Sequence, residues 1–324
     1  MKKITLILMA AFLVVTVGSC TKDETPNNNN NNGNENTFND GVYKPGKNIG
    51  YCYEWNEWLN ERMLTEVWNW NGTKLESIDH MTYSGDISWT EALSYQGDRV
   101  DRVEKNGSEY ESTEYTHDGN HLSKVSFYYN NILEILMTFS YGGNGRVSQI
   151  KADIYDTKAL TRGFVSQMKP YFPKSFLDRM EEHRGDKEHD ESFTLKIQWT
   201  GENISRMELV SVYSGYNYSV TCSDVYTFEF DAKNNPKQGF LGLYTFDESM
   251  FDLNAYYSKN NITYCRNTYR EYGYEGDEHF DEEETQETEF IYQYDGADFP
   301  AQISRTHHYT GGDYNTYTYY YEYL

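Results

Sequence analysis

The sequence predicts an all-β protein, a long antiparallel β-meander of repeated hairpins that is curled or closed like a barrel. Three observations support this fold class. Aromatic residues make up 17% of the chain and include 32 tyrosines, a strand-turn-strand pattern recurs along it, and glycine, asparagine and aspartate mark the turns. Tyrosine packs a large ring and keeps a hydroxyl for water, so this composition suits sheets with a wet face.

The N-terminus has the layout of a secretory signal, because two lysines precede an apolar run over residues 4–17 that is too short to favour spanning a bilayer. Gly18-Ser19-Cys20 follows and resembles the lipobox of bacterial lipoproteins. We therefore expect residues 1–19 to be removed and Cys20 to carry lipid. The alternative is a plain secretory signal with a chance cysteine.

Residues 20–48 are predicted to form a flexible tether. Asn27 to Asn32 are six consecutive asparagines, and the segment has almost no apolar residue to bury. Random-coil scaling gives an end-to-end distance of roughly 30 Å. Its start, Thr21-Lys22-Asp23-Glu24, is similar to the export signal that sends lipoproteins of Bacteroides-type bacteria to the cell exterior, although soluble linkers also begin with charged residues.

Residues 49–324 are expected to form a single β-rich domain with a strongly acidic surface. Removal of the leader takes away two lysines and no acids, which leaves 26 basic and 51 acidic residues and a formal charge of −25. Such a surface repels phosphate backbones, so nucleic acid is excluded as a partner.

The recurring unit has two aromatic or apolar residues at alternate positions, a turn cluster, and then two apolar residues three positions apart. Its period of two fits a strand, and its turn residues accept the positive φ angles of tight hairpins. Seven copies are found, with anchor residues Trp70, Tyr95, Tyr115, Tyr141, Trp199, Phe230 and Tyr294. They predict consecutive hairpins with strands of roughly eight to ten residues. Tyr317, Tyr319, Tyr321 and Tyr323 would share one face of a last strand.

Two intervals between anchors are long. Residues 158–184 show helical spacing at Leu160, Phe164 and Met168, and they predict a small helical insertion that covers the sheet or acts as a lid. The stretch from Glu275 to Glu289 contains nine acids and is predicted to be a solvated loop.

With Cys20 lipidated, Cys52, Cys222 and Cys265 remain. This odd number allows one disulfide at most. A bridge between Cys222 and Cys265 is conceivable, and three buried free thiols are slightly favoured.

No local signature of a catalytic or metal site is present in the sequence. His183 and His189 lie among acids, an arrangement more typical of solvated helix ends than of a metal site. His307 and His308 are adjacent in a strand and would face opposite ways. We expect no catalytic residue, metal or cofactor.

Tryptophans crowd the first third of the domain and are the remaining candidates for ligand binding. Exposed aromatic platforms bind sugars or partner proteins on many surface proteins, although such residues more often pack in a core. The tryptophans are Trp55, Trp58, Trp68, Trp70 and Trp89.

Units such as Tyr292-Gln293-Tyr294-Asp295-Gly296 resemble the tyrosine-aspartate repeats of Rhs-type shell proteins over a few residues. The lipobox, tether and hairpin units together resemble more closely a family of Bacteroides-type lipoproteins of unknown function with a porin-like fold. That resemblance implies a many-stranded sheet and carries no catalytic residues.

We therefore expect a lipid-anchored protein of the outer membrane that faces the cell exterior and acts as a non-catalytic binding or scaffold module for a glycan, peptide or protein. One alternative is a surface hydrolase acting on glycans, since a pair of carboxylates leaves no local signature. The other is a transmembrane β-barrel, which would need an apolar band facing lipid. Polar residues such as Thr316 and Thr318 occupy the faces where that band would lie.

Overall fold

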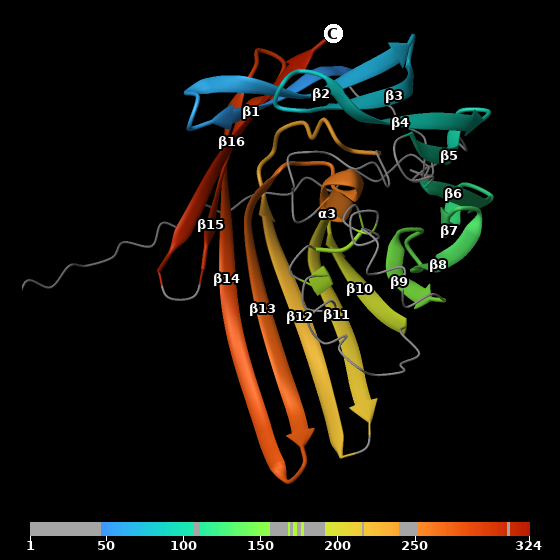
Figure 1. Ribbon diagram of the computed structural model, residues 1–324, viewed down its shortest axis with the longest axis vertical. Helices are drawn as coiled ribbons and strands as arrows, with labels where there is room; N and C mark the ends of the chain where they lie inside the picture. The colour runs from blue at the N-terminus through green and yellow to red at the C-terminus, as the bar shows by residue number, and fades with distance from the viewer. Residues whose placement is uncertain are drawn as a thin grey trace, which may run out of the picture. The chain divides into compact units, whose positions relative to one another are not determined.

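The computed structural model describes residues 47–106, 111–155, 168, 171–173, 176–177, 192–215, 217–239, 252–309 and 312–324. Within these residues the chain forms one closed antiparallel barrel, in which every strand pairs with its neighbours in sequence and the last strand pairs with the first (Figure 1). The predicted meander is confirmed, and the open question of curling or closure is resolved as closure. The leader, Cys20 and the tether up to residue 46 lie outside the described residues.

The sixteen strands are β1 (Ile49–Asn56), β2 (Glu61–Asn71), β3 (Lys74–Met81), β4 (Ile87–Gln96), β5 (Arg99–Asn106), β6 (Glu111–Asp118), β7 (His121–Tyr129), β8 (Ile132–Tyr141), β9 (Val147–Ile154), β10 (Ser192–Thr200), β11 (Asn203–Gly215), β12 (Tyr218–Phe230), β13 (Ile262–Glu275), β14 (Glu278–Tyr294), β15 (Pro300–His308) and β16 (Tyr314–Tyr323). One helix, α3 (Asp252–Tyr257), lies between β12 and β13.

The barrel has two ends, which we name from the direction of β1. The proximal end contains the start of β1 and the end of β16, where the backbone N–H of Leu324 donates to the carbonyl of Asn48 at 3.0 Å. The tight turns at Gly72, Gly97 and Gly119, each with positive φ, also lie there. The distal end contains the turns that follow the odd-numbered strands, such as residues 57–60 after β1.

Six of the seven predicted hairpins are present, and the sixth is wrong. Phe230 ends β12, but β13 begins only at Ile262, after a long connection that includes α3. The asparagines that were predicted to form a turn donate hydrogen bonds within this connection instead. The Asn235 amide donates to the carbonyl of Ser258 at 2.8 Å, and the amide of Asn261 donates to the Asp231 carboxylate at 3.1 Å.

Most anchor aromatics of the repeats tie neighbouring hairpins together. The register shifts by one residue immediately before the anchor in β2, β4, β8 and β10, as in a β-bulge. The anchor then donates a hydrogen bond to a backbone carbonyl of the preceding strand. These bonds join Trp70 to Ile49, Tyr95 to Leu75, Tyr141 to Leu122 and Trp199 to Val147, at 2.7 to 2.8 Å. The repeated motif is therefore a structural tie.

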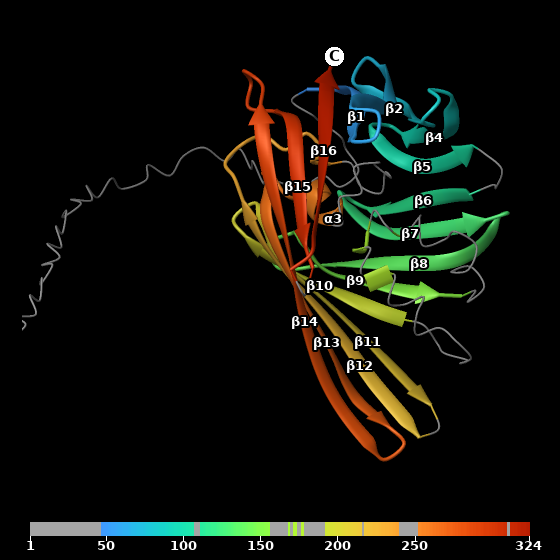
Figure 2. The ribbon, with the colours of Figure 1, turned by 60° about the vertical axis from the view of Figure 1, so that its left-hand side comes forward.

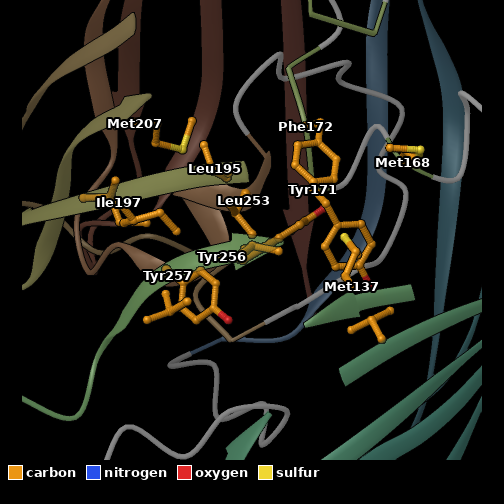
Figure 3. Close-up of a cluster of buried hydrophobic side chains, with 14 of the residues drawn as sticks. Met137, Met168, Tyr171, Phe172, Leu195, Ile197, Met207, Leu253, Tyr256 and Tyr257 are labelled. Atoms are coloured by element: carbon orange, nitrogen blue, oxygen red, sulfur yellow. The ribbon is translucent and has the colours of Figure 1, made fainter. Parts of the chain in front are cut away.

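Apolar side chains face the interior of the barrel. The inward face of β8 carries Ile135 and Met137, both fully buried, and the predicted face of β16 carries the buried Tyr319 and Tyr321. Helix α3 lies inside the ring of strands in both Figure 1 and Figure 2. Figure 3 shows three residues of α3, Leu253, Tyr256 and Tyr257, among side chains from β8, β10 and β11. The interior is a packed core at this level.

The predicted helical insertion contributes to the same core. Met168, Tyr171 and Phe172 are buried, and the ring of Phe172 meets that of Phe193 edge-on at 4.7 Å. Met168 is helical, as are Phe176 and Leu177. The other residues of 158–184 lie outside the described residues.

Charged and hydroxyl side chains face outward. Ion pairs cross the outer surface between Arg102 and Glu114, Lys196 and Glu208, and Arg266 and Glu287, at 3.0, 3.7 and 2.8 Å. Threonines pair across β15 and β16 at Thr306 and Thr316. The outer face thus carries many charged and hydroxyl groups, unlike the apolar band of a barrel that faces lipid.

The acidic stretch from Glu275 to Glu289 is not a loop, contrary to the prediction. It belongs to the β13–β14 hairpin, and β14 spans Glu278–Tyr294. Its acids are exposed because β11 to β14 extend together past the ends of the other strands at the distal end (Figures 1 and 2). Backbone pairing and the Arg270–Asp281 ion pair at 2.6 Å hold it in a strand.

Candidate functional site

A hollow at the distal rim brings together aromatic residues from both ends of the domain. Its volume is about 490 Å³, within the range of ligand pockets in proteins. We call it the aromatic groove. It is lined by Glu54, Trp55, Asn56, Glu57, Trp58, Met63, Tyr83, Tyr314, Asn315, Thr316, Tyr317 and Thr318. The pairing of β1 with β16 creates it, since those two strands carry most of the lining.

Trp58 is the most exposed large apolar residue of the groove, with 97% of its surface accessible. It lies in the turn after β1, and the side-chain oxygen of Asn56 accepts hydrogen bonds from the backbone N–H groups of Trp58 and Leu59, both at 3.0 Å. Asn60 completes the turn with a φ of 53°. The local sequence therefore fixes the backbone that presents the indole ring to solvent.

Two further turns present tyrosines to the same hollow. Tyr83 is exposed in the turn between β3 and β4, where the Thr82 hydroxyl accepts from the N–H of Asp86 at 3.2 Å. Tyr314 follows the turn between β15 and β16, in which Tyr309 and Asp313 share a backbone hydrogen bond of 2.9 Å. A more open hollow beside Tyr314 is lined by Tyr309, Gly312, Asp313 and Asn315.

Tyr317 forms the inner wall of the groove and rests on a buried arginine. The guanidinium carbon of Arg305 lies 4.8 Å from the centre of the Tyr317 ring and 5.5 Å from that of Tyr319. Arg305 is almost fully buried inside the barrel. This stacking supports Tyr317 from below and leaves the groove itself lined by aromatic, carboxylate, amide and hydroxyl groups.

Such a lining can bind a ligand that has both apolar faces and many polar groups. Aromatic rings supply flat contact area at low entropic cost, while carboxylates and amides of the groove bind hydroxyl or amino groups. A sugar ring presents C–H faces and hydroxyl edges of this kind.

The five tryptophans singled out from the sequence divide into two groups. Trp55 and Trp58 line the groove, as the binding hypothesis required. Trp68 is buried, Trp70 forms a hairpin tie, and Trp89 stacks on His80 with ring centres 3.7 Å apart. Those three serve packing, as the simpler interpretation held. Sequence reasoning missed Tyr83 and Tyr314, which no local pattern connects to the tryptophans.

A second group of titratable residues is buried inside the barrel on β2, β3 and β4. The two ring nitrogens of His80 lie 3.7 Å from Glu66 and 3.8 Å from Glu91, and Lys105 lies over the Trp89 ring. The neighbouring cavity, lined in part by Glu66 and Lys237, is about 10 Å³, room for about one water molecule. That cavity does not admit a substrate to these carboxylates.

Another interior cavity lies near the proximal end between α3 and strands β13 to β16. Its volume is about 50 Å³, and its lining is mostly apolar, with Phe290, Ile303 and Tyr321 beside the buried cations Lys237 and Arg305. This space suits a few water molecules.

The remaining sequence candidates are placed as follows. His307 faces inward, with Nδ1 2.8 Å from the Thr288 hydroxyl, and His308 faces outward near Glu289, so the predicted opposite orientation is confirmed. His183 and His189 lie outside the described residues. Within the described ranges, no group of three histidine, cysteine or acidic residues is arranged to hold a metal ion.

The cysteines of the domain are free and buried. Cys52, Cys222 and Cys265 lie on the inward faces of β1, β12 and β13. Burial raises the pKa of the Cys265 thiol well above its ordinary value. The favoured prediction of free thiols is confirmed, and the conceivable Cys222–Cys265 bridge is absent.

No protein-family model and no curated protein match this chain. Among solved structures, a porin-like protein from Bacteroides uniformis ATCC 8492 matches 88% of this chain and 100% of its own, with 10% sequence identity and a TM-score of 0.50. The chain has a porin-like β fold. A porin-like protein from Bacteroides vulgatus ATCC 8482 covers 86% of this chain and 99% of its own, at 9% identity and a TM-score of 0.44. Identities this low concern the fold alone. No helix in the described parts of this porin-like chain is long and apolar enough to cross a membrane.

Proposed function

We propose that this protein is a lipid-anchored surface module whose aromatic groove binds a glycan without cleaving it. The observation that carries the proposal is the cluster of the exposed Trp58, Tyr83 and Tyr314 with the half-buried Trp55 around a hollow of about 490 Å³. Tryptophan and tyrosine are enriched among the residues that contribute most to binding interfaces. A concave site of this size favours a chain of a few sugar units over a flat protein surface.

The position of the groove fits attachment through Cys20 at the outer membrane. The chain enters the barrel at the proximal end, where Lys47 pairs with Asp295 and lies over the rings of Phe299 and Tyr323. The groove lies at the other end of β1. A lipid on Cys20 would therefore be connected to the barrel through its proximal end, and the groove lies at the opposite end.

A membrane-spanning barrel is the less favoured function because of the outer surface. Arg102, Lys196, Glu208, Arg266 and Glu287 face outward on strands spread around the barrel. Charged residues on a lipid-facing strand cost about 2–4 kcal/mol each at the bilayer midplane for arginine or lysine. Many such residues together oppose insertion.

The binding test uses the mature chain with Cys20→Ser, which receives no lipid. Titration calorimetry against soluble oligosaccharides from several polysaccharides is expected to find at least one ligand. Trp58→Ala should weaken that binding by about tenfold or more, and Tyr155→Ala, which removes an exposed ring outside the groove, should leave it unchanged. Equal binding by wild type and Trp58→Ala would disprove the assignment.

A second measurement on the ligands found by titration separates binding from hydrolysis. Incubation of each bound oligosaccharide with the protein, followed by chromatography, is expected to return the ligand intact. Shorter products that disappear in Glu57→Gln would support the hydrolase instead.

The anchor is tested in cells. Wild-type protein should be cleaved by protease added to intact cells and should partition with membranes, while Cys20→Ala should be released. Protection of the wild-type protein from external protease would contradict the exterior location.

A further inference from the structure

We infer, on the basis of the proposed function, that the aromatic groove selects glycans with free amino groups over glycans with carboxylate or sulfate groups. The juxtaposition that carries this inference is that two carboxylates, Glu54 and Glu57, line the same hollow as Trp55 and Trp58. A protonated amino sugar can stack on the aromatic rings and pair its ammonium group with the carboxylates. An acidic sugar matches only the aromatic rings and is repelled by the carboxylates.

The charges of the lining have one sign. Among its twelve residues, two are acidic and the others are aromatic, amide, hydroxyl or thioether side chains, with no lysine, arginine or histidine. An acidic ligand therefore finds no cationic partner in the lining itself. Electrostatic matching of this kind contributes to specificity and to association rate.

Two arginines close to the groove are stacked on tyrosines. Arg305 is buried and stacks on Tyr317, and the guanidinium carbon of Arg62 lies 3.7 Å from the centre of the Tyr320 ring. Arg62 pairs with Trp55 across β1 and β2, but neither arginine belongs to the lining.

The aromatic rings add an attraction that only a cation receives. An ammonium group within about 6 Å of the face of a tryptophan or tyrosine is attracted by the negative face of the ring. Trp58, Tyr83 and Tyr314 offer exposed rings. Acetylation of the amino group removes the charge and leaves the sugar ring and its stacking surface in place.

The acidic β13–β14 hairpin does not replace the lining carboxylates. Its acids belong to a part of the barrel separated from β1 by β15 and β16. Charges beyond the Debye length of about 8 Å at physiological ionic strength are largely screened. Selection must come from carboxylates that touch the ligand.

The experiment measures the binding of three 1,4-linked tetrasaccharides to the mature Cys20→Ser chain by titration calorimetry. One is made of glucosamine, one of N-acetylglucosamine and one of galacturonic acid. The pH is slightly acidic, so that the sugar amines are protonated. We expect the glucosamine tetramer to bind about tenfold more tightly than the acetylated one, and the galacturonic acid tetramer to bind most weakly. Added salt should reduce the difference in affinity between the glucosamine tetramer and the acetylated tetramer.

Variants distinguish groove selection from general attraction to an acidic protein. Glu57→Gln should lower the affinity for the glucosamine tetramer to that for the acetylated tetramer. The affinity for the acetylated tetramer should not change. Glu278→Gln removes an exposed acid on β14 and should preserve the preference. Trp58→Ala should weaken both neutral and amino tetramers.

The outcomes separate the two proposals. Equal affinity for amino and acetylated tetramers, with loss of both in Trp58→Ala, would overturn the charge selection and leave glycan binding in place. A preference that Glu278→Gln removes as fully as Glu57→Gln would also overturn it. Affinities unchanged by Trp58→Ala for every tetramer would overturn glycan binding at the groove as well.

Discussion

The indole nitrogen of Trp70, near the end of β2, donates a hydrogen bond to the carbonyl of Ile49, the first residue of β1, at 2.7 Å. Ile49 also pairs with Tyr323 of the last strand. A single tryptophan thus connects the first hairpin to the seam at which the barrel closes. Equivalent bonds from Tyr95 and Tyr141 repeat this tie along the wall.

The first prediction concerns these ties. Tyr95→Phe and Tyr141→Phe remove the donor and keep the ring, so each should lower the free energy of unfolding by about 1 kcal/mol, the net worth of one hydrogen bond. Urea denaturation measures it. Tyr51→Phe, on the outer face of β1, is the control and should change stability little. Equal effects in all three variants would refute the tie.

The second prediction tests the polarity of the barrel on one strand. Leu209 of β11 is fully buried, and Val212 of the same strand is 63% exposed. Leu209→Lys places an unpaired charge in the core and should cost about 4 kcal/mol or more, while Val212→Lys should stay within about 0.5 kcal/mol. Thermal denaturation in detergent-free buffer measures both. A barrel that faced lipid would tolerate the two lysines in the opposite order.

The third prediction concerns the turn that presents Trp58. Asn56→Ala removes the acceptor of two backbone hydrogen bonds, so the turn becomes mobile in the free protein and binding must order it. Glycan affinity should fall, though less than in Trp58→Ala, and global stability should change little. Asn56→Asp retains the acceptor oxygen and should retain most of the affinity of the wild type. Calorimetric titration decides this, and an unaffected Asn56→Ala variant would contradict it.

The fourth prediction is a pH dependence of stability. Burial lowers the pKa of His307 from 6.5, and the charges of Arg305 and His308 lower it further. Above pH 6.5 the residue is neutral in both states. As the pH falls below that value, the unfolded chain binds the proton first, so stability is lost until the pH reaches the folded pKa. Urea midpoints measured between about pH 7.5 and about pH 5 should therefore fall less in His307→Gln than in wild type.

His308 supplies the matched control for that measurement. It is adjacent in sequence but exposed on the outer face, and His308→Gln should retain most of the wild-type loss on acidification. An identical pH profile for wild type and His307→Gln would show that the buried imidazole is not responsible.

The hairpins were predictable because the information for them is local. Alternating aromatics define strand faces, and residues such as Gly72 or Gly119 define turns within a few positions. The sixth unit misled because Asn234, Asn235 and Pro236 are equally suited to turns and to long connections. Only the partners of Asn235 in the segment near α3 distinguish the two.

The acidic strand was missed for a related reason. Charge density predicts solvent exposure well, but exposure does not exclude a strand when a hairpin extends beyond the wall and both its faces meet water. The register that pairs Arg270 opposite Glu283, with Asp281 nearby, depends on β13 and has no signature in β14 alone.

The groove could be predicted only in part. Two of its tryptophans stood out by composition, but Trp58 and Tyr314 are far apart in sequence and meet because β16 pairs with β1. Closure depends on strand number and tilt around the whole ring, which no segment of sequence specifies by itself.

The seam between β1 and β16 also sets the order of events in biogenesis. Until Tyr321 is made and reaches Cys52, both outermost strands of the growing sheet keep unpaired backbone groups, which attract other chains. Non-local pairing of this kind folds slowly. A nearly finished sheet of this kind is open at both edges, and pairing of its last strand with its first removes the surface at which other chains would add.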